Sequence, residues 1–145
     1  MIQVLIGMGS NIEPERHLAA AAREIREVHP SAHFSSVYRS PPVGMQGDDF
    51  LNACCLIETT QSREKLAAWL KQIEDRHGRD RTAGAWRPRT LDLDLIFYGT
   101  ECLDDDLYRH AHVHVPASEL MKLEAFAGSV AMLHRVALDL SKAGT

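Results

Sequence analysis

The chain has 145 residues, 45% of them hydrophobic and 25% charged, and a formal net charge of -4 at pH 7. This length and composition predict one globular domain over residues 1–145, and the acidic balance argues against nucleic-acid binding, which relies on a positive surface. No apolar run approaches the roughly 18 residues of a membrane span, and the start lacks the basic segment of a signal peptide. Three cysteines without a CxxC pair predict a reduced, cytoplasmic protein.

The first half of the chain predicts three strands and one helix. Residues 2–6 are a short apolar run, typical of a buried strand that leaves into a turn at Gly7 and Gly9. A helix begins near Pro14, which suits a first helical turn, and ends before Pro30 because the residue before a proline avoids the α region. Residues 33–39 predict a second strand, which breaks at two prolines, and residues 50–60 predict a third.

The second half predicts a helix, two strands and a packed C-terminal helix. Ser62 can cap a helix that runs to about residue 77, and residues 91–97 predict a strand. A turn at 98–99, a short strand to residue 103 and a solvated turn at 104–106 follow, and residues 130–140 are amphipathic. The order β-α-β-β-α-β predicts an α+β, ferredoxin-like sandwich, an antiparallel sheet with its helices mainly on one face.

Two carboxylates share one face of the strand predicted at 91–97. Asp92 and Asp94 alternate with leucines, so both point the same way, with Cα atoms about 6.6 Å apart. At an effective dielectric near 20 the two charges repel by roughly 2–3 kcal/mol if they lie that close. A divalent cation relieves this repulsion, and Mg²⁺ is commonly held by one or two carboxylates plus substrate phosphates. The pair therefore predicts a magnesium site, and a solvated strand face with two acids is the alternative.

A segment rich in arginine and glycine precedes these two acids. Guanidinium groups keep their charge and match the oxygen geometry of phosphates. A cationic loop that leads into paired carboxylates has the parts of a phosphoryl-transfer site, whereas the alternative is an exposed basic loop. No GxxxxGK[ST] motif occurs, which excludes a Walker-type site. The arginines are Arg76, Arg79, Arg81, Arg87 and Arg89.

Six short motifs in this chain, in one consistent order, together resemble a known family. They are Gly9-Ser10-Asn11, Tyr38-Arg39-Ser40-Pro41-Pro42, Asp49-Phe50-Leu51-Asn52-Ala53, Arg79-x-Arg81, Trp86-x-Pro88-Arg89 and Thr90-Leu91-Asp92-Leu93-Asp94. This pattern is similar to that of the 6-hydroxymethyl-7,8-dihydropterin pyrophosphokinases of folate biosynthesis, which share the ferredoxin-like fold. The run from Arg79 to Asp94 is highly distinctive, whereas the first triplet alone would be weak.

The resemblance implies transfer of pyrophosphate from ATP to the pterin hydroxymethyl group, with release of AMP. It implies that Asp92 and Asp94 hold two Mg²⁺ ions and that Arg79 and Arg89 neutralise phosphate charge. The implied pterin slot is lined by Ser40, Pro41, Val43, Phe50 and Asn52. The implied nucleotide contacts are Glu74, Arg81 and Trp86, to which we add His112 and His114.

Two of these residues also carry independent signals in the sequence. A buried Asn52 amide would offer a donor and an acceptor together, which the amide edge of a pterin requires; a strand-edge turn residue is the alternative. Glu74 falls at the C-terminal end of a predicted helix, where the macrodipole disfavours an acid, so its position indicates a role.

The chain departs from the family pattern after about residue 104. Pro116 aligns, but Ala117 stands where the family has a histidine, and no arginine follows until Arg135. Lys122 and Phe126 are the available replacements for the missing cation and aromatic side chain. His110, His112 and His114, if extended, share a strand face; phosphate contacts, plain exposure and a transition-metal site all remain open for them.

Two other functions remain open from the sequence. One is a paralogue that keeps the magnesium and nucleotide site but has changed or lost the pterin acceptor. The other is a noncatalytic ferredoxin-like module that binds a small ligand or RNA, although no RNP-type aromatic motif is present. We expect ATP and a pterin as the only partners, with neither nucleic acid nor membrane, and a monomer.

Overall fold

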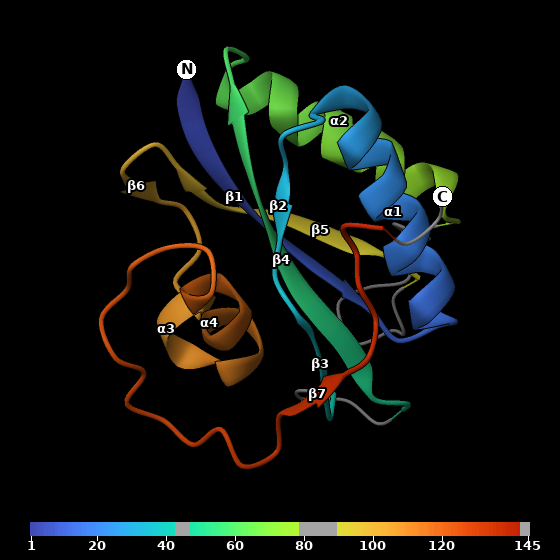
Figure 1. Ribbon diagram of the computed structural model, residues 1–145, viewed down its shortest axis with the longest axis vertical. Helices are drawn as coiled ribbons and strands as arrows, with labels where there is room; N and C mark the ends of the chain where they lie inside the picture. The colour runs from blue at the N-terminus through green and yellow to red at the C-terminus, as the bar shows by residue number, and fades with distance from the viewer. Residues whose placement is uncertain (43–46, 79–89, 143–145) are drawn as a thin grey trace.

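A seven-stranded antiparallel sheet forms the centre of the molecule (Figure 1). The computed structural model describes residues 1–42, 47–78 and 90–142, and every structural statement below concerns these ranges. The sheet order is β6-β5-β1-β4-β3-β7, with β2 also paired to β4. The strands are β1 (Ile2–Ser10), β2 (His33–Phe34), β3 (Val37–Ser40), β4 (Phe50–Thr59), β5 (Asp92–Tyr98), β6 (Glu101–Cys102) and β7 (His134–Val136).

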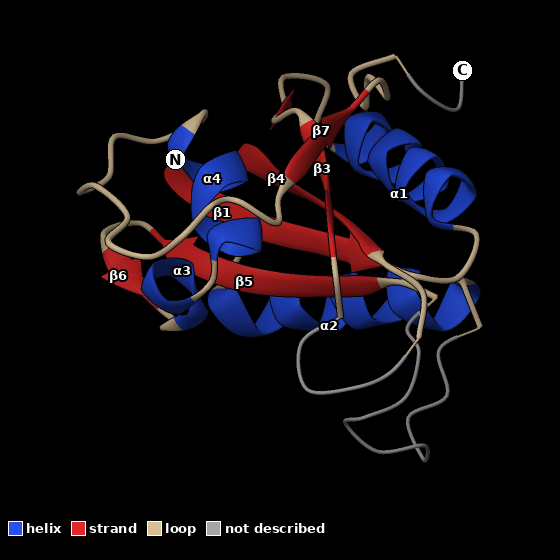
Figure 2. Ribbon diagram, turned by 90° about the horizontal axis from the view of Figure 1, so that it is seen from below, coloured by secondary structure: helices blue, strands red, loops and turns tan. Residues whose placement is uncertain are grey.

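Helices cover both faces of this sheet, but unequally (Figures 1 and 2). The long helices α1 (Pro14–Val28) and α2 (Arg63–Arg76) pack on one face, and the short helices α3 (Asp106–Arg109) and α4 (Ala111–Ser118) pack on the other. The central order β5-β1-β4-β3 and the placement of α1 and α2 confirm the predicted ferredoxin-like α+β fold. None of the described helices is both long and apolar enough to cross a membrane.

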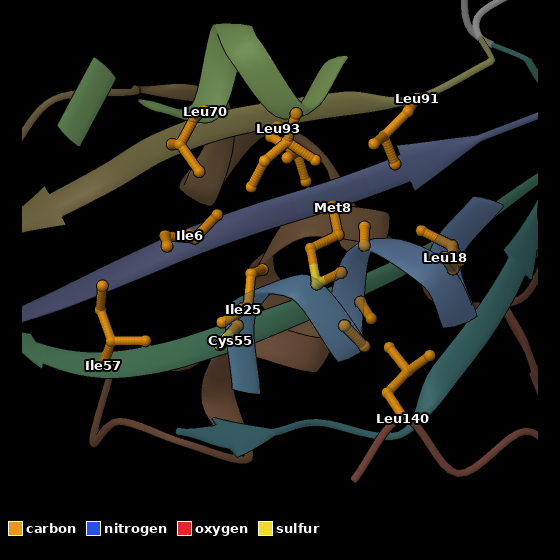
Figure 3. Close-up of a cluster of buried hydrophobic side chains, with 14 of the residues drawn as sticks. Ile6, Met8, Leu18, Ile25, Cys55, Ile57, Leu70, Leu91, Leu93 and Leu140 are labelled. Carbon is orange, nitrogen blue, oxygen red and sulfur yellow. The ribbon is translucent and has the colours of Figure 1, made fainter. Parts of the chain in front are cut away.

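The larger core lies between the sheet and the two long helices (Figure 3). Each large apolar side chain fully buried there contributes about 1.5–3 kcal/mol relative to an exposed one. Even-numbered residues of β1 and odd-numbered residues of β4 point into it, as do Leu93 and Leu95 of β5, in agreement with period-two alternation. The fully or almost fully buried residues include Ile6, Met8, Leu18, Ile25, Cys55, Ile57, Leu70, Leu93 and Leu140.

The two long helices begin and end where the sequence predicts. Pro14 occupies the first turn of α1, and the helix ends at Val28, before Pro30. Ser62 caps α2, because its side chain accepts a hydrogen bond from the Lys65 amide at 3.2 Å. Leu70 lies on the buried face of α2.

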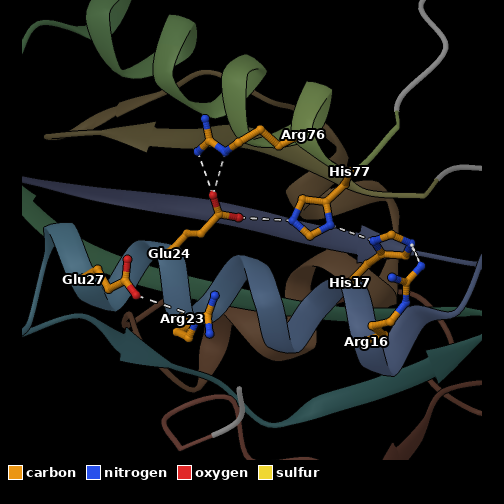
Figure 4. A network of polar contacts seen from close by, with 7 residues as sticks. All are labelled: Arg16, His17, Arg23, Glu24, Glu27, Arg76 and His77. Carbon is orange, nitrogen blue, oxygen red and sulfur yellow. Dashed lines mark hydrogen bonds and ion pairs between the residues drawn. The ribbon is translucent and has the colours of Figure 1, made fainter. Parts of the chain in front are cut away.

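A chain of polar side chains joins α1 to the C-terminal end of α2 (Figure 4). The Nδ1 atoms of His17 and His77 lie 2.7 Å apart, and Nε2 of His77 lies 3.1 Å from a carboxylate oxygen of Glu24. The Arg76 guanidinium also contacts Glu24, at 2.7 Å. Since only one hydrogen fits between the two Nδ1 atoms, the contact requires that one of the two rings accept there. Burial lowers the pKa of His17, which favours the neutral ring.

Two predictions for the first half of the chain were wrong in detail. The predicted turn at Gly7 and Gly9 is instead the second half of β1, because pairing with β4 and β5 satisfies the backbone there on both sides. The strand predicted at 33–39 is split into β2 and β3. At the break, the Ser36 amide donates a hydrogen bond to the Glu119 carboxylate at 2.8 Å.

The histidine-rich segment is helical, so the strand face that an extended chain would give these histidines does not form. His112 and His114 belong to helix α4, and Ala117 of this helix is buried in the same cluster as Leu5 and Cys54 of the sheet. Among the described residues, no group of three or more histidine, cysteine or acidic side chains could hold a metal ion.

The C-terminal segment is not the expected helix. Residues 121–133 lack helical structure, and β7 follows as an edge strand. Val130 is 50% exposed, whereas Leu140 is buried in the larger core and Val136 and Leu138 pack against it, so strand pairing and these contacts hold the segment rather than a helical face.

The two adjacent cysteines of β4 point to opposite faces of the sheet. Cys54 packs in the cluster beneath α3 and α4, and Cys55 packs in the larger core on the opposite face. Both are free thiols, and burial raises the pKa of each far above its ordinary value, so both stay protonated and apolar.

Candidate functional site

A cavity of about 220 Å³ opens on the sheet face that carries α3 and α4. It brings together residues from four strands, β1, β3, β4 and β5, and from the segment after β6. Seven of the predicted site residues line it, namely Ser40, Pro41, Phe50, Asn52, Asp92, Asp94 and His112. Gly7, Gly9, Cys54, Asp104 and Asp106 are also on its wall.

The register of the three central strands explains this convergence. Gly9 of β1 pairs with Asn52 of β4 on one side and with Asp92 of β5 on the other. Directly opposed residues of antiparallel strands point to the same face, so Asn52 and Asp92 flank a position that has no side chain. Gly7 stands in the same relation to Asp94 in the next row. The two glycines therefore form a bare floor between the acids and the amide.

The acidic pair has the arrangement that the alternation predicts. Asp92 is partly buried and Asp94 is exposed, and both line the cavity, while Leu93 between them is 5% exposed and belongs to the opposite core. Asp104 and Asp106 reach the same cavity from the α3 side. Asp92 and Asp94 offer oxygen ligands of the kind that suits Mg²⁺, while the described residues bring no third histidine, cysteine or acid close enough to complete a metal site.

The opposite side of the cavity is neutral and more rigid. Asn52 is 5% exposed, and its Nδ2 donates to Ser40 Oγ at 2.8 Å and to the Tyr38 carbonyl at 3.2 Å. These two bonds fix the amide plane and commit its donors to the protein. A Cβ atom on Gly9 would lie 3.6 Å from Oδ1 of Asn52 and 3.8 Å from the ring of Phe50, so both border the glycine floor.

Three residues predicted to contact the nucleotide have different surroundings. His112 lines the cavity, its ring centroid 5.2 Å from that of His110, and burial lowers the pKa of His112 to about 4, so the ring is neutral at pH 7. His114 is buried, with Nε2 2.9 Å from the Glu124 carbonyl. Glu74 is buried between α2 and β5, where it accepts a hydrogen bond from the Leu93 amide at 2.7 Å. Neither His114 nor Glu74 is on the cavity wall.

The Glu74 contact links the helix side of the sheet to the acidic pair. Leu93 lies between Asp92 and Asp94, so a carboxylate behind the strand fixes the backbone that presents both acids in front. The hydrogen bond from the Leu93 amide stabilises the Glu74 carboxylate at the C-terminal end of α2, where the helix macrodipole disfavours a negative charge. Five further predicted site residues, Val43, Arg79, Arg81, Trp86 and Arg89, lie outside the described residues.

Sequence reasoning missed the acids after β6. Residues 104–106 were expected to be a solvated turn, but Oδ1 of Asp104 accepts a hydrogen bond from the Asp106 amide at 2.9 Å at the start of α3, and both side chains line the cavity. Three consecutive acids were the signal in the sequence. Only the packing of the segment around α3 reveals that two of them line the same cavity as Asp92 and Asp94.

Comparisons with known proteins show which family the chain is similar to. The chain is 37% identical over 133 residues to a Haemophilus influenzae protein named 2-amino-4-hydroxy-6-hydroxymethyldihydropteridine pyrophosphokinase, covering 83% of this chain and 82% of that one. Proteins of the same name from Pseudomonas aeruginosa and Synechocystis are 34% and 39% identical, over 81% and 69% of this chain and 75% and 52% of their own lengths. The model of the 7,8-dihydro-6-hydroxymethylpterin-pyrophosphokinase family matches residues 5–127. The chain therefore belongs to the 7,8-dihydro-6-hydroxymethylpterin-pyrophosphokinase family.

Proposed function

We propose that this chain transfers pyrophosphate from ATP to 6-hydroxymethyl-7,8-dihydropterin, giving AMP and the pterin diphosphate. One observation carries the proposal. In a member of this family, a single cavity places the buried amide of Asn52 and the ring of Phe50 across a glycine floor from Asp92 and Asp94. A flat heterocycle and a metal-bound triphosphate are the two ligands that these opposite walls suit.

The pterin is expected to lie on the neutral side of the cavity. Phe50 offers an aromatic face for stacking, and the amide of Asn52 offers Oδ1 as an acceptor, because its donors already bind Ser40 and Tyr38. The bare backbone at Gly9 leaves room for the hydroxymethyl group to point toward the acids. Pro41 closes the same side, and Val43 is proposed to complete it.

The acidic side is expected to hold the triphosphate through magnesium. Asp92 and Asp94 supply hard oxygen ligands on one face of β5, which fits Mg²⁺, and we propose that they share two ions. Bound metal would neutralise charge along the phosphates and lower the pKa of the acceptor hydroxyl. Arg79 and Arg89, with Arg81 and Trp86, are proposed to contact the nucleotide from the segment before β5.

In the proposed reaction, the hydroxymethyl oxygen attacks the β-phosphorus of ATP. A new oxygen–phosphorus bond forms, the bond between the β-phosphorus and the oxygen bridging to the α-phosphate breaks, and AMP leaves. The acceptor proton passes to solvent. The chain's own contribution is alignment of the two substrates, because phosphoryl transfer depends mainly on positioning and charge stabilisation.

The segment after β6 supports a second candidate, a related activity on another hydroxymethyl acceptor. This part of the chain departs from the family pattern, yet it contributes Asp104, Asp106 and His112 to the cavity wall. A neutral imidazole and two extra acids beside the acceptor could change which heterocycle fits. AMP formation with the pterin and with a panel of hydroxymethyl heterocycles separates the two candidates.

The direct test is a calorimetric titration followed by an assay. We expect the pterin to bind protein loaded with Mg²⁺ and a nonhydrolysable ATP analogue, and AMP to appear when ATP replaces the analogue. Absence of both binding and AMP formation would refute the pterin as acceptor. We also propose that the protein works as a cytoplasmic monomer with small-molecule partners only; the three free cysteines fit a reducing compartment.

A further inference from the structure

Two buried polar side chains follow Gly9 at the end of β1. Ser10 is fully buried and Asn11 is 4% exposed. Neither lines the cavity, but each bonds to a segment that leads into it. Because β1 lies between β4 and β5, neighbouring side chains at its end can reach a segment on either side.

Ser10 contacts the segment that leads into the acidic strand. Its Oγ lies 2.5 Å from the carbonyl oxygen of Thr90 and 3.2 Å from that of Ile12. A hydroxyl has one hydrogen to donate, and the shorter contact identifies Thr90 as its acceptor. Thr90 stands two residues before Asp92, and within the described part of the chain its own hydroxyl is buried with no hydrogen-bond partner. The Ser10 bond therefore connects the central strand to the start of β5.

Asn11 contacts the segment that leads into the neutral side of the cavity. Its Nδ2 donates to the Asp48 carbonyl at 3.2 Å. Asp48 stands two residues before Phe50, the first residue of β4 and a wall of the cavity. Asp48 itself is exposed, so this bond to a buried amide ties an otherwise solvent-facing turn to the end of β1.

We propose that Ser10 and Asn11 are positioning residues that set the two halves of the site separately. Ser10 aligns the acidic, nucleotide-binding half through Thr90, and Asn11 aligns the neutral, pterin-binding half through Asp48. This inference rests on the proposed function, and it assigns a role to two residues that contact neither the reacting atoms nor the cavity. A merely structural role would predict lower stability with both substrates affected alike.

The test separates the two halves by kinetics. Ser10→Ala should lower kcat about tenfold and raise KM for MgATP, with KM for the pterin within about twofold of wild type, because small misalignments of reacting groups cost rate. Asn11→Ala should raise KM for the pterin about tenfold and leave KM for MgATP within about twofold. Ser10→Cys and Asn11→Asp keep the volume while weakening or removing the donor, and they replace any alanine variant that does not fold.

A matched control comes from the other end of the sheet. Thr59 is 4% exposed, and its Oγ1 accepts a hydrogen bond from the Gln61 amide at 3.0 Å. Thr59→Val removes a buried hydroxyl of the same kind and should lower Tm without moving either KM. If the Ser10 and Asn11 variants shift both KM values in parallel, or neither, the positioning roles are wrong. If wild-type protein forms no AMP with the pterin, the proposed function fails, and this inference with it.

Discussion

The two faces of the central sheet are formed by the same strands but have different roles: one packs against the larger core, and the other lines the cavity. On β1, residues Val4, Ile6 and Met8 point toward α1 and α2 and are almost fully buried in apolar contacts. The opposite face of the same strand carries Leu5 and then two glycines, Gly7 and Gly9. Alternation thus lets one strand fill a core on one side and leave an open floor on the other.

The cavity exists because helices α3 and α4 cover only part of the sheet face that carries Gly7 and Gly9. Helices α3 and α4 bury the end of that face around Leu5 and Ile96, and the cavity lies beside them. A sheet held rigid from behind by a complete core can present side chains in front with fixed spacing. We therefore expect substitutions on the two faces to separate stability from activity.

The largest effect is expected at the acidic pair. Asp94→Ala should lower kcat/KM on the order of 10²–10³-fold, because a ligand for the metal–triphosphate is lost. The free energy of unfolding should change little, since Asp94 is an exposed side chain outside both cores. AMP formation and urea denaturation measure the two quantities. Asp105→Ala, which removes a neighbouring acid that is 82% exposed, should change neither.

The second prediction concerns the filled face. Leu70→Ala in α2 removes a side chain that is 2% exposed and should lower the free energy of unfolding by about 2–5 kcal/mol. At a temperature where the variant is still folded, both KM values should match wild type, because Leu70 lies on the far side of the sheet from the cavity. A large change in KM without loss of stability would contradict the separation of the two faces.

The third prediction places a methyl group on the glycine floor. Gly9→Ala meets only ordinary contacts, 3.6 Å and 3.8 Å from its nearest neighbours, so the fold should tolerate it. The methyl group nevertheless occupies the space between Asn52 and Asp92, and KM for the pterin should rise about tenfold, or ~1.4 kcal/mol. Gly99→Ala is the matched control, a substitution that should affect stability but not binding. Because Gly99 has φ of +64°, an alanine there should lower the free energy of unfolding by about 1 kcal/mol and leave both KM values unchanged.

The smallest expected effect is a pH dependence on the filled face. Burial lowers the pKa of His17 below its ordinary value of 6.5, so the unfolded chain binds more protons than the folded one just below that pH. The free energy of unfolding should therefore fall as the pH drops below 6.5. His17→Asn keeps a donor near Nδ1 but does not titrate, and its stability should decline less between pH 6.5 and 5 in urea melts. An equal decline in both proteins would exclude His17 as a contributor.

Local pattern was sufficient for most of the regular elements and for the acidic pair. The cap at Ser62, the helix end before Pro30 and the alternation around Leu93 depend on neighbouring residues only, and the structure confirms them. These features follow from backbone sterics, helix capping and strand periodicity, all of which can be predicted from residues close together in the sequence.

Tertiary contacts decided the elements where local signals were weak or misleading. Gly7 and Gly9 look like a turn, but double pairing in the middle of a sheet makes them strand. His112 and His114 alternate like a strand, yet packing onto the sheet makes them helical. The amphipathic C-terminal segment pairs with β3 as strand β7, and Leu140, Val136 and Leu138 pack against the larger core.

The sequence by itself determined which chemistry is present: paired acids, a buried amide and a strongly cationic segment, in the order typical of one family. Only the tertiary structure decided that Asp104 and Asp106 join this chemistry and that Glu74 supports it from behind the sheet. The physical reason is distance along the chain. Strand periodicity acts over two residues, whereas the contact between α3 and the sheet, or between α2 and β5, exists only once separate segments have packed together.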